Sequence, residues 1–336
     1  MQSRSRRILS AAILVSVLAC ALAVVGLMQR NPGTVLIIEH AVPAPALVSA
    51  VLPPRVDAAA PTPQSAPSTS NDEQAGSEQP RPSVPVVSHE DSRLLSVIRA
   101  ALGNDAADAS VVVRRLSDGT TAAWNADHVY YAASTYKLEV LYEAFRRRLA
   151  GDLSFEREQP LEGRFIDEDL GTLDLVPRGP HGGLIVEDAI RAMVTLSDNT
   201  SATLMLDLLG GRAIDTTMRG LGLTDSSVNT EALPTTAADM ARLMEAIVRG
   251  EGLDAEATRE MTALLLAQET RTGIPRGVPA AVPVGNKTGT WEDATHDVAV
   301  VFAPSGTYVI AVLTDNAWDW DPIVRVSRAV YGYLER

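Results

Sequence analysis

The sequence predicts an α+β fold in which one antiparallel sheet takes strands from both ends of the folded region, with an all-helical subdomain between them in the chain. Three observations predict this fold. One helix and two strands come first, almost only helical patterns follow from about residue 134 to 249, and three strands with a closing helix come last. Because the strand signals are split between the two ends, a single sheet must bring those ends together.

The individual elements follow from periodicity. Apolar residues at helical spacing predict a helix over residues 90–102, and alternating runs at 109–116 and 121–124 predict two strands across the turn Ser117–Thr120. Six further helices are expected at residues 137–149, 185–196, 201–209, 213–219, 237–248 and 254–267. Three strands are then expected around residues 282–289, 296–302 and 308–313. A last helix is expected from about residue 322 to 334.

Residues 1–30 are predicted to be an N-terminal membrane anchor or signal segment. Arg4, Arg6 and Arg7 precede an uncharged run of 21 residues, 8–28. As a helix this run spans roughly 31 Å, which is about the thickness of the hydrocarbon core of a bilayer. Positive charges before the run outnumber Arg30 after it, which predicts a cytoplasmic N-terminus and an extracytoplasmic remainder.

Two alternatives to a retained anchor stay open. Ala21-Leu22-Ala23 is a passable signal-peptidase site, and Val17-Leu18-Ala19-Cys20 loosely resembles a bacterial lipobox with Cys20 as the lipidated residue. Apolar residues continue past both candidate cleavage points, which favours the uncleaved anchor. Each alternative places the folded region at the extracytoplasmic face of a bacterial cell membrane, either anchored or secreted.

Residues 31–89 are expected to be a disordered linker rich in Pro, Ala and Ser. Ten of the 20 prolines of the chain lie between residues 41 and 88, and no aromatic residue lies there. Such a segment cannot bury enough apolar surface to offset its conformational entropy. The folded domain is therefore expected to comprise residues 90–336.

Charge and cysteine content exclude several classes of function. The formal net charge of −13 repels a phosphate backbone, so no nucleic-acid partner is expected. A single cysteine, Cys20, allows no intramolecular disulfide, cysteine-rich zinc site or iron–sulfur cluster, and the five histidines have no metal-like spacing. Only two of the 29 basic side chains are lysines, Lys137 and Lys287, so each requires a specific explanation.

The chemistry begins at Ser134-Thr135-Tyr136-Lys137. A serine hydroxyl becomes a good nucleophile when a base takes its proton, and a spacing of three on a helix places an amine one turn away. Lysine can supply that base because its pKa falls readily on burial, whereas arginine stays protonated. By itself, this pattern is also typical of an N-cap serine followed by a solvated lysine.

Two further motifs follow. Ser197-Asp198-Asn199 comes at the end of a predicted helix, where it is also an ordinary interhelical capping sequence. Lys287-Thr288-Gly289-Thr290 lies in a predicted strand, where glycine allows a close approach of another backbone or a ligand and an edge lysine can hold a carboxylate. Taken alone, the Lys287–Thr290 motif is also typical of a short polar strand. Both lysines of the chain lie inside these motifs.

The three motifs in this order resemble those of the serine β-lactamase and penicillin-binding-protein superfamily, with its Ser-x-x-Lys, Ser-Asp-Asn and Lys-Thr-Gly signatures. The run from Met193 to Ala202 is most similar to class A β-lactamases, and the resemblance covers essentially all of residues 90–336. It implies a serine β-lactamase/DD-peptidase-like fold. No metal or organic cofactor is required by this resemblance.

The resemblance implies a role for each motif residue. Ser134 corresponds to the acylated nucleophile and Lys137 to its proton acceptor or relay. Ser197 corresponds to the group that passes a proton to the leaving nitrogen. Four other residues bind substrate or steer its carboxylate in this comparison: Asn199, Lys287, Thr288 and Thr290. The backbone N–H groups of Ser134 and Thr290 correspond to the oxyanion hole. Gly289 completes the substrate-binding strand.

One part of the class A pattern is missing. That family carries an Ω-loop in which a glutamate, followed four residues later by asparagine, holds the water for deacylation. The corresponding stretch here, Gly222–Thr236, is drastically shortened, and Glu231 is followed by no asparagine at that spacing. Glu231 is a weak candidate for the deacylation base, because the pattern favours a solvated residue in a short loop. His296 is expected to be structural rather than to line the site.

Three functions follow as alternatives. The first is a class A β-lactamase-like hydrolase that opens β-lactams, with slow turnover. The second is a cell-wall D-alanyl peptidase or penicillin-binding protein, which differs in whether water reaches the acyl-enzyme. The third is a catalytically silent envelope-binding domain, which the intact pair Ser134 and Lys137 disfavours. The expected partners are a small-molecule substrate and, through the N-terminal segment, a membrane, and the catalytic domain is expected to be monomeric.

Overall fold

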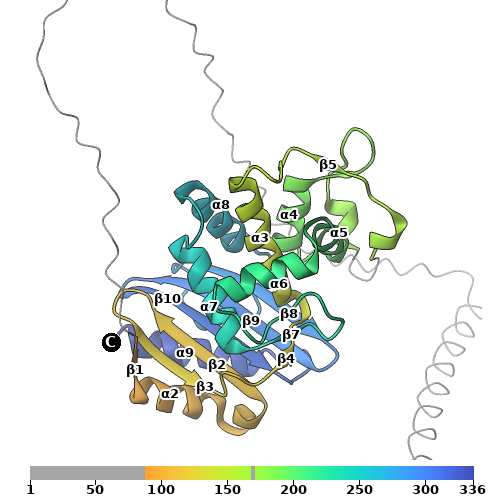
Figure 1. The fold of residues 1–336 in the computed structure, drawn as a ribbon. Coiled ribbons are helices and arrows are strands. Elements are labelled where there is room, and N and C mark those ends of the chain that lie inside the picture. The colour runs from red at the N-terminus through yellow and green to blue at the C-terminus, as the bar shows by residue number, and fades with distance from the viewer. Residues whose placement is uncertain (1–87, 168–170) are drawn as a thin grey trace, which may run out of the picture. The chain divides into compact units, whose positions relative to one another are not determined.

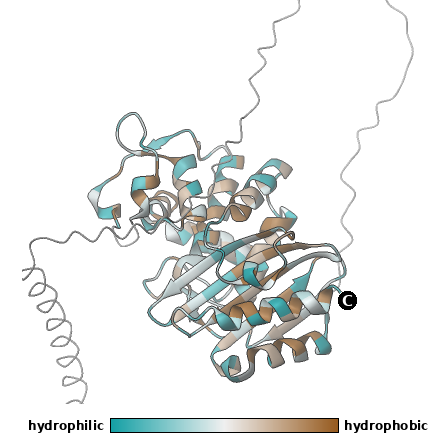
Figure 2. Cartoon of the chain, turned by 180° about the vertical axis from the view of Figure 1, so that it is seen from behind, coloured by the Kyte–Doolittle hydropathy of each residue, from teal (hydrophilic) through white to brown (hydrophobic). Residues whose placement is uncertain are grey.

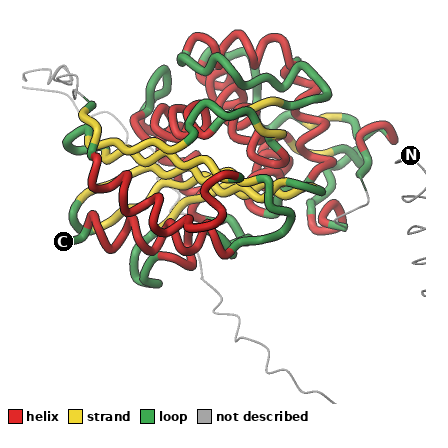
Figure 3. Tube along the Cα trace, turned by 90° about the horizontal axis from the view of Figure 1, so that it is seen from below, coloured by secondary structure: helices red, strands yellow, loops and turns green. Residues whose placement is uncertain are grey.

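The structure, a computed structural model, describes residues 88–167 and 171–336. The predicted anchor and almost all of the predicted linker lie outside these residues. Among the helices that the structure describes, none combines the length and the apolar character needed to cross a bilayer. The described chain forms the predicted α+β fold, with a mostly antiparallel sheet between two layers of helices (Figures 1 and 3).

The central sheet takes its six strands from both chain ends, as predicted. These strands are β1 (His89–Glu90), β2 (Ala109–Arg115), β3 (Thr120–Trp124), β8 (Val284–Trp291), β9 (Ala294–Ala303) and β10 (Gly306–Thr314). Their order is β1-β3-β2-β10-β9-β8, so β8 forms one edge of the sheet. All neighbours are antiparallel except β1 and β3.

The sheet is covered on both faces, and most residues of its central strands are accordingly buried. On β10, Val309, Ala311 and Leu313 belong to the core shared with the helical subdomain. The alternate residues Ile310 and Val312 belong to a second core, beneath helices α2 (Ser92–Leu102) and α9 (Asp321–Leu334). The period of two that defines a strand therefore sends successive side chains into two separate cores.

Helices α2 and α9 join the first and last elements of the domain. The buried residues of α2 are Leu94, Ile98 and Leu102, which lie on one helical face. Asp91 caps α2 by accepting hydrogen bonds from the amides of Arg93 and Leu94, and it also accepts one from Tyr333 Oη of α9 at 2.8 Å. Figure 2 shows these helices with apolar residues on one side and polar residues on the other.

The helical subdomain is built around one central helix. Its helices are α3 (Lys137–Leu149), α4 (Val186–Thr195), α5 (Asn199–Leu209), α6 (Gly211–Gly220), α7 (Ala237–Arg249) and α8 (Ala255–Leu266). Every residue of α3 from Lys137 to Phe145 is buried, because α4, α5, α6, α7 and α8 all contact this helix. The helix that carries Lys137 is therefore immobilised by its surroundings.

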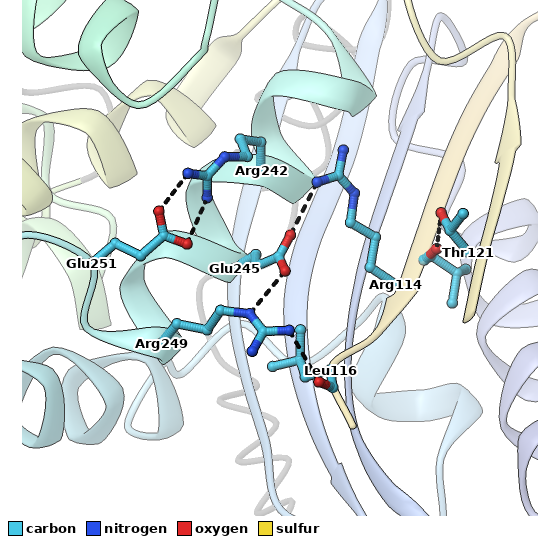
Figure 4. Close-up of polar contacts among 8 residues, drawn as sticks. Arg114, Leu116, Thr121, Arg242, Glu245, Arg249 and Glu251 are labelled. Atoms are coloured by element: carbon cyan, nitrogen blue, oxygen red, sulfur yellow. Dashed lines mark hydrogen bonds and ion pairs between the residues drawn. The ribbon is translucent and has the colours of Figure 1, made fainter. Parts of the chain in front are cut away.

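Helix α7 connects this subdomain to the sheet (Figure 4). Glu245 of α7 accepts hydrogen bonds from Arg114 of β2 at 3.0 Å and from Arg249 at 2.9 Å. Arg249 also donates to the carbonyl of Leu116 at 3.0 Å. Because Glu245 is largely buried and the arginines are half-buried, this network fixes the helix against the sheet more firmly than isolated exposed pairs would.

The expectation of almost only helices between residues 134 and 249 is incomplete. Tyr130–Tyr131 (β4) pairs with Pro234–Thr235 (β7), and Glu158–Gln159 (β5) pairs with Leu184–Ile185 (β6). Strands of two residues show no periodicity, so these ladders left no sequence signal. Strand β1 also begins at His89, one residue before the predicted start of the domain.

We expect residues 88–336 to fold cooperatively without the preceding chain. Starting the fragment at residue 104 instead removes α2 and its three fully buried apolar side chains. Each such loss costs about 2–5 kcal/mol, so together they approach the whole stability of an ordinary domain. Thermal unfolding and limited proteolysis of both fragments test this. A protease-labile 88–336 fragment would contradict the boundary, and a stable 104–336 fragment would contradict the role of α2.

Candidate active site

The predicted nucleophile Ser134 lies on a strained turn that leads into α3. It is half-buried in a short 3-10 helix, Ala133–Tyr136, one turn before Lys137. Ala133 has a φ of 44°, a left-handed value that costs a non-glycine residue roughly 1–2 kcal/mol. Hydrogen bonds of Ala132 hold the turn: its amide donates to Leu233 O at 2.8 Å, and its carbonyl accepts from Thr135 Oγ1 at 2.7 Å.

The edge strand β8 passes directly beside this turn. A Cβ atom on Gly289 would lie 3.0 Å from Ala132 O and 3.1 Å from Ser134 N. Glycine is required here because a side chain would push the strand away from the nucleophile. This close approach brings the strand that carries Lys287, Thr288 and Thr290 alongside Ser134.

The Ser197-Asp198-Asn199 motif forms the turn between α4 and the start of α5. Asp198 caps α5 by accepting a hydrogen bond from Ser201 N at 2.6 Å. Ser197, immediately before it, has a φ of 60°. This unusual backbone conformation places Ser197 between the two lysines instead of continuing a helix.

Both lysines converge on Ser197. Lys137 Nζ donates to Ser197 O at 2.6 Å, to Ser197 Oγ at 3.2 Å and to Asn199 Oδ1 at 2.7 Å. Lys287 Nζ donates to the same Ser197 Oγ at 2.9 Å and to Thr288 O at 2.9 Å. The structure thus joins the three sequence motifs through one hydroxyl group.

Burial makes this pair of amines unusual. Both lysine side chains are 0% exposed. Burial lowers the pKa of Lys137 to about 7, against the opposing negative charges of Asp198 and Asp167. Burial and, after it, the charge of Lys137 hold the pKa of Lys287 well below its usual range. Two ammonium groups on one hydroxyl repel each other, so a neutral amine is available as a base near neutral pH.

Ser134 itself is not hydrogen-bonded to either amine within the described residues. The bonds of Lys137 go to Ser197 and Asn199, so its lone pair must turn toward Ser134 Oγ for proton transfer. The helical spacing of three residues keeps the two groups one turn apart, and catalytic hydrogen bonds commonly tighten only with substrate bound.

The two threonines predicted to bind substrate on β8 differ in burial. Thr288 is buried, whereas Thr290 is half-buried.

Aromatic residues next to the site were missed by the sequence analysis. Trp291 directly follows Thr290 and is 50% exposed, and its ring lies 5.9 Å from that of Tyr131. The missed carboxylate is Asp167, whose Oδ2 accepts a hydrogen bond from Asn199 Nδ2 at 3.1 Å. None of these residues belongs to a motif. The position of Trp291 directly after the Lys-Thr-Gly-Thr motif was the one sequence signal for an aromatic residue at the site.

Two residues considered from sequence have structural settings. Glu231 is exposed on the loop before β7, and no hydrogen bond or ion pair holds its carboxylate within the described chain. His296 is buried, and its Nδ1 accepts a hydrogen bond from the backbone amide of Thr314. Its Nε2 lies 2.9 Å from the carbonyl oxygen of Tyr131. An amide can only donate and a carbonyl can only accept, so this ring is neutral with its proton on Nε2. Burial lowers its pKa to about 4.

A metal-binding arrangement is not found in the described residues, since no three His, Cys, Asp or Glu side chains gather there as ligands would. The groups that the three motifs bring together are a serine, two buried amines, a second hydroxyl and an amide. A serine one helical turn from a buried amine is the arrangement that is typical of serine-dependent acyl hydrolases.

Comparison with known proteins agrees with this class. A model of the beta-lactamase enzyme family matches residues 93–334, so the chain belongs to that family. This confirms the resemblance seen in the three motifs. Beta-lactamase AST-1 of Nocardia asteroides is 32% identical over 229 residues, which cover 61% of this chain and 70% of that protein.

Solved structures show the same fold. The structure of PBP-A matches with a TM-score of 0.68 at 24% identity, covering 74% of this chain and 98% of the solved chain. The β-lactamase from Desulfarculus baarsii matches with a TM-score of 0.64 at 28% identity, covering 73% of this chain and 97% of the solved one.

The two lysines allow a direct test of the site electrostatics. In protein labelled with ¹³C at lysine Cε, only two lysine signals exist, and Lys137→Gln and Lys287→Gln variants assign them. We expect the Lys137 signal to titrate near pH 7 because its ammonium is buried. NMR over pH 5–11 measures this, with the unfolded protein in urea as control. Titration of both folded-state signals near the ordinary lysine value would contradict the proposed electrostatics.

Proposed function

We propose that this chain is an extracytoplasmic serine hydrolase that opens the amide bond of β-lactams through an acyl-enzyme on Ser134. The observation that carries the proposal is the convergence of two fully buried lysines on Ser197 Oγ beside the strained turn of Ser134. Membership of the β-lactamase family supports the substrate class. Beta-lactamase AST-1, a relative at 32% identity, supports it further.

In the acylation step, neutral Lys137 takes the proton of Ser134 Oγ as that oxygen attacks the β-lactam carbonyl. The backbone N–H groups of Ser134 and Thr290 stabilise the oxyanion, because β8 and the turn lie in contact at Gly289. Cleavage of the ring C–N bond transfers a proton from Ser197 to the nitrogen. Lys137 or Lys287 then restores that proton, since both contact Ser197 Oγ.

Substrate binding falls to the residues around this centre. When Lys137 is neutral, Lys287 carries the one positive charge of the pair and attracts the substrate carboxylate, with Thr288 and Thr290 as hydrogen-bonding partners. Asn199, whose amide is already polarised between Lys137 and Asp167, holds the substrate amide. No residue in these steps requires a cofactor.

Deacylation is the slow half-reaction in this proposal. It needs a base and an ordered water, and Glu231 is exposed and unanchored in the shortened loop. A mutant of PBP-A, 25% identical to this chain, is described as an acyl-enzyme complex with penicillin G. A D-alanyl peptidase or penicillin-binding function is therefore the second candidate. Release of D-alanine from a D-alanyl-D-alanine peptide would favour it over β-lactam hydrolysis.

The location of the enzyme follows from the sequence signals. The predicted segment 1–30 and linker 31–89 place the domain outside the cytoplasmic membrane, either anchored there, lipidated at Cys20 or secreted. The catalytic domain acts as a monomer in this proposal, because the three motifs that form the site all belong to one chain.

Replacing Lys137 by arginine is expected to abolish acylation although the charge is kept. A guanidinium cannot lose its proton near neutral pH, so the base is lost, and general-base loss costs roughly 10²–10⁴ in rate. Lys287→Arg is the matched control and is expected to be milder. Mass spectrometry after mixing with penicillin G measures both adducts. Acylation of Lys137→Arg at the parental rate would show that another group is the base.

Nitrocefin hydrolysis is expected to show a burst of one equivalent followed by a weak steady state. Acylation has its groups in place in the described chain, whereas Glu231 is only a weak candidate for the deacylation base. Because Glu231 is exposed and unanchored, Glu231→Gln is expected to leave the adduct lifetime unchanged. Stopped-flow traces of both proteins measure this. A longer lifetime in the variant would identify Glu231 as the base, and fast burst-free turnover by the parent would refute slow deacylation.

A further inference from the structure

Asp167 and Thr172 contact three consecutive residues of the Ser-Asp-Asn turn and the start of α5: Asp198, Asn199 and Thr200. Asn199 Nδ2 donates to Asp167 Oδ2 at 3.1 Å, and the amide of Asp167 donates to Thr200 Oγ1 at 2.9 Å. Thr172 Oγ1 of the same segment donates to Asp198 Oδ2 at 2.6 Å. Residues that lie 26 to 33 positions earlier in the chain therefore hold this turn, and no motif predicted these contacts.

We propose that Asp167 is a positioning residue, whose carboxylate locks the Asn199 amide in one orientation and so reserves the Lys137 amine for Ser134. This inference rests on the proposed function, because it assigns a role within the same acylation step. Asp167 acts through Asn199, which donates to its carboxylate and accepts a hydrogen bond from Lys137 Nζ.

The locking follows from what each group can donate and accept. A carboxylate only accepts hydrogen bonds, so the NH₂ end of the Asn199 amide faces Asp167 and its oxygen faces Lys137 Nζ, at 2.7 Å. A neutral amine both donates and accepts. Without the carboxylate, the amide can rotate by half a turn and donate its NH₂ to the Lys137 lone pair. That lone pair is the one that must take the proton of Ser134.

The charge of Asp167 has a second, separable consequence. Titratable groups act on both amines: Asp198 and Asp167 act on Lys137, and Lys137 and Asp297 act on Lys287. The two nearest carboxylates raise the pKa of Lys137 against the lowering effect of burial. Neutralising Asp167 therefore lowers the pKa of Lys137. Because acylation needs neutral Lys137, the acid limb of the pH–rate profile, where the rate falls as this amine is protonated, moves to lower pH.

The substitution Asp167→Asn separates positioning from mere structural support. It keeps the size of the side chain, a hydrogen-bond acceptor and both backbone contacts with Thr200, and it removes the charge and the fixed polarity. Asp174→Asn is the matched control, since Asp174 is an exposed carboxylate in the 3-10 helix Thr172–Leu175 of the same segment. Asp167→Glu is the rescue variant, because it restores a carboxylate.

The test measures the acylation rate of the full-length proteins by a fluorescent penicillin between pH 5 and 9, with thermal unfolding in parallel. We expect Asp167→Asn to lower the high-pH plateau roughly 10- to 100-fold, as misplaced catalytic groups do, and to move the acid limb to lower pH. Asp167→Glu should recover much of the plateau, and Asp174→Asn should match the parent. An unchanged plateau and acid limb, with or without a lower unfolding temperature, would overturn the proposal.

A second readout does not depend on β-lactam chemistry. In ¹³Cε-lysine NMR, Asp167→Asn is expected to move the titration of the Lys137 signal to lower pH, whereas Asp174→Asn leaves it in place. If no penicillin acylates the parent protein, the proposed function is refuted but the inference is not. The change in the Lys137 titration then tests the coupling of Asp167 to Lys137. A Lys137 titration identical in parent and Asp167→Asn would overturn the inference in either case.

Discussion

The rest of the site depends on one constraint, which is that two buried lysine amines share the hydroxyl group of Ser197. Like charges this close in a low-dielectric interior cannot both persist, so proximity itself keeps a base available at neutral pH. Transferring an ammonium from water into the protein costs several kcal/mol, which the folded state tolerates only because the surrounding contacts are fixed. The two apolar cores on either side of the sheet supply that rigidity.

Three separate segments must meet within hydrogen-bond distance for this constraint to hold. Helix α3 brings Lys137 from the buried centre of the helical subdomain, the interhelical turn brings Ser197, and the edge strand β8 brings Lys287. Backbone strain is concentrated at this junction, at Ala133 and at Ser197 itself. Strain of this kind persists only where neighbouring structure enforces it. Here the close approach of Gly289 constrains the turn at Ala133, and the hydrogen bond between Asn199 and Asp167 constrains the turn at Ser197.

Sequence periodicity was sufficient for the elements and for their order. Helix α3 spans the predicted residues 137–149, and the sheet draws its strands from both chain ends, because amphipathic patterns record which face each element buries. The two-residue ladders escaped because they have no period. Asp167 escaped for another reason: its partner Asn199 lies 32 residues away, and such a contact is created by the path of the chain rather than by local composition. Likewise, only the fold could show that His296 is held neutral between a carbonyl and an amide.

The two halves of the proposed reaction depend on different parts of the fold. Acylation uses the junction of α3, the turn and β8, where every group is buried or held. Deacylation would use the loop between α6 and β7, and that loop is not loose, because Asp215 accepts from Ser227 Oγ and Val228 N, and Asp239 accepts from Asp225 N and Ser226 Oγ. The loop is therefore anchored by carboxylates of the two helices that flank it, α6 and α7, while Glu231 takes no part in this network within the described residues. In the proposed reaction, a slow second step therefore arises from where an ordered loop places Glu231, and ordering the loop further would not bring that carboxylate into the network.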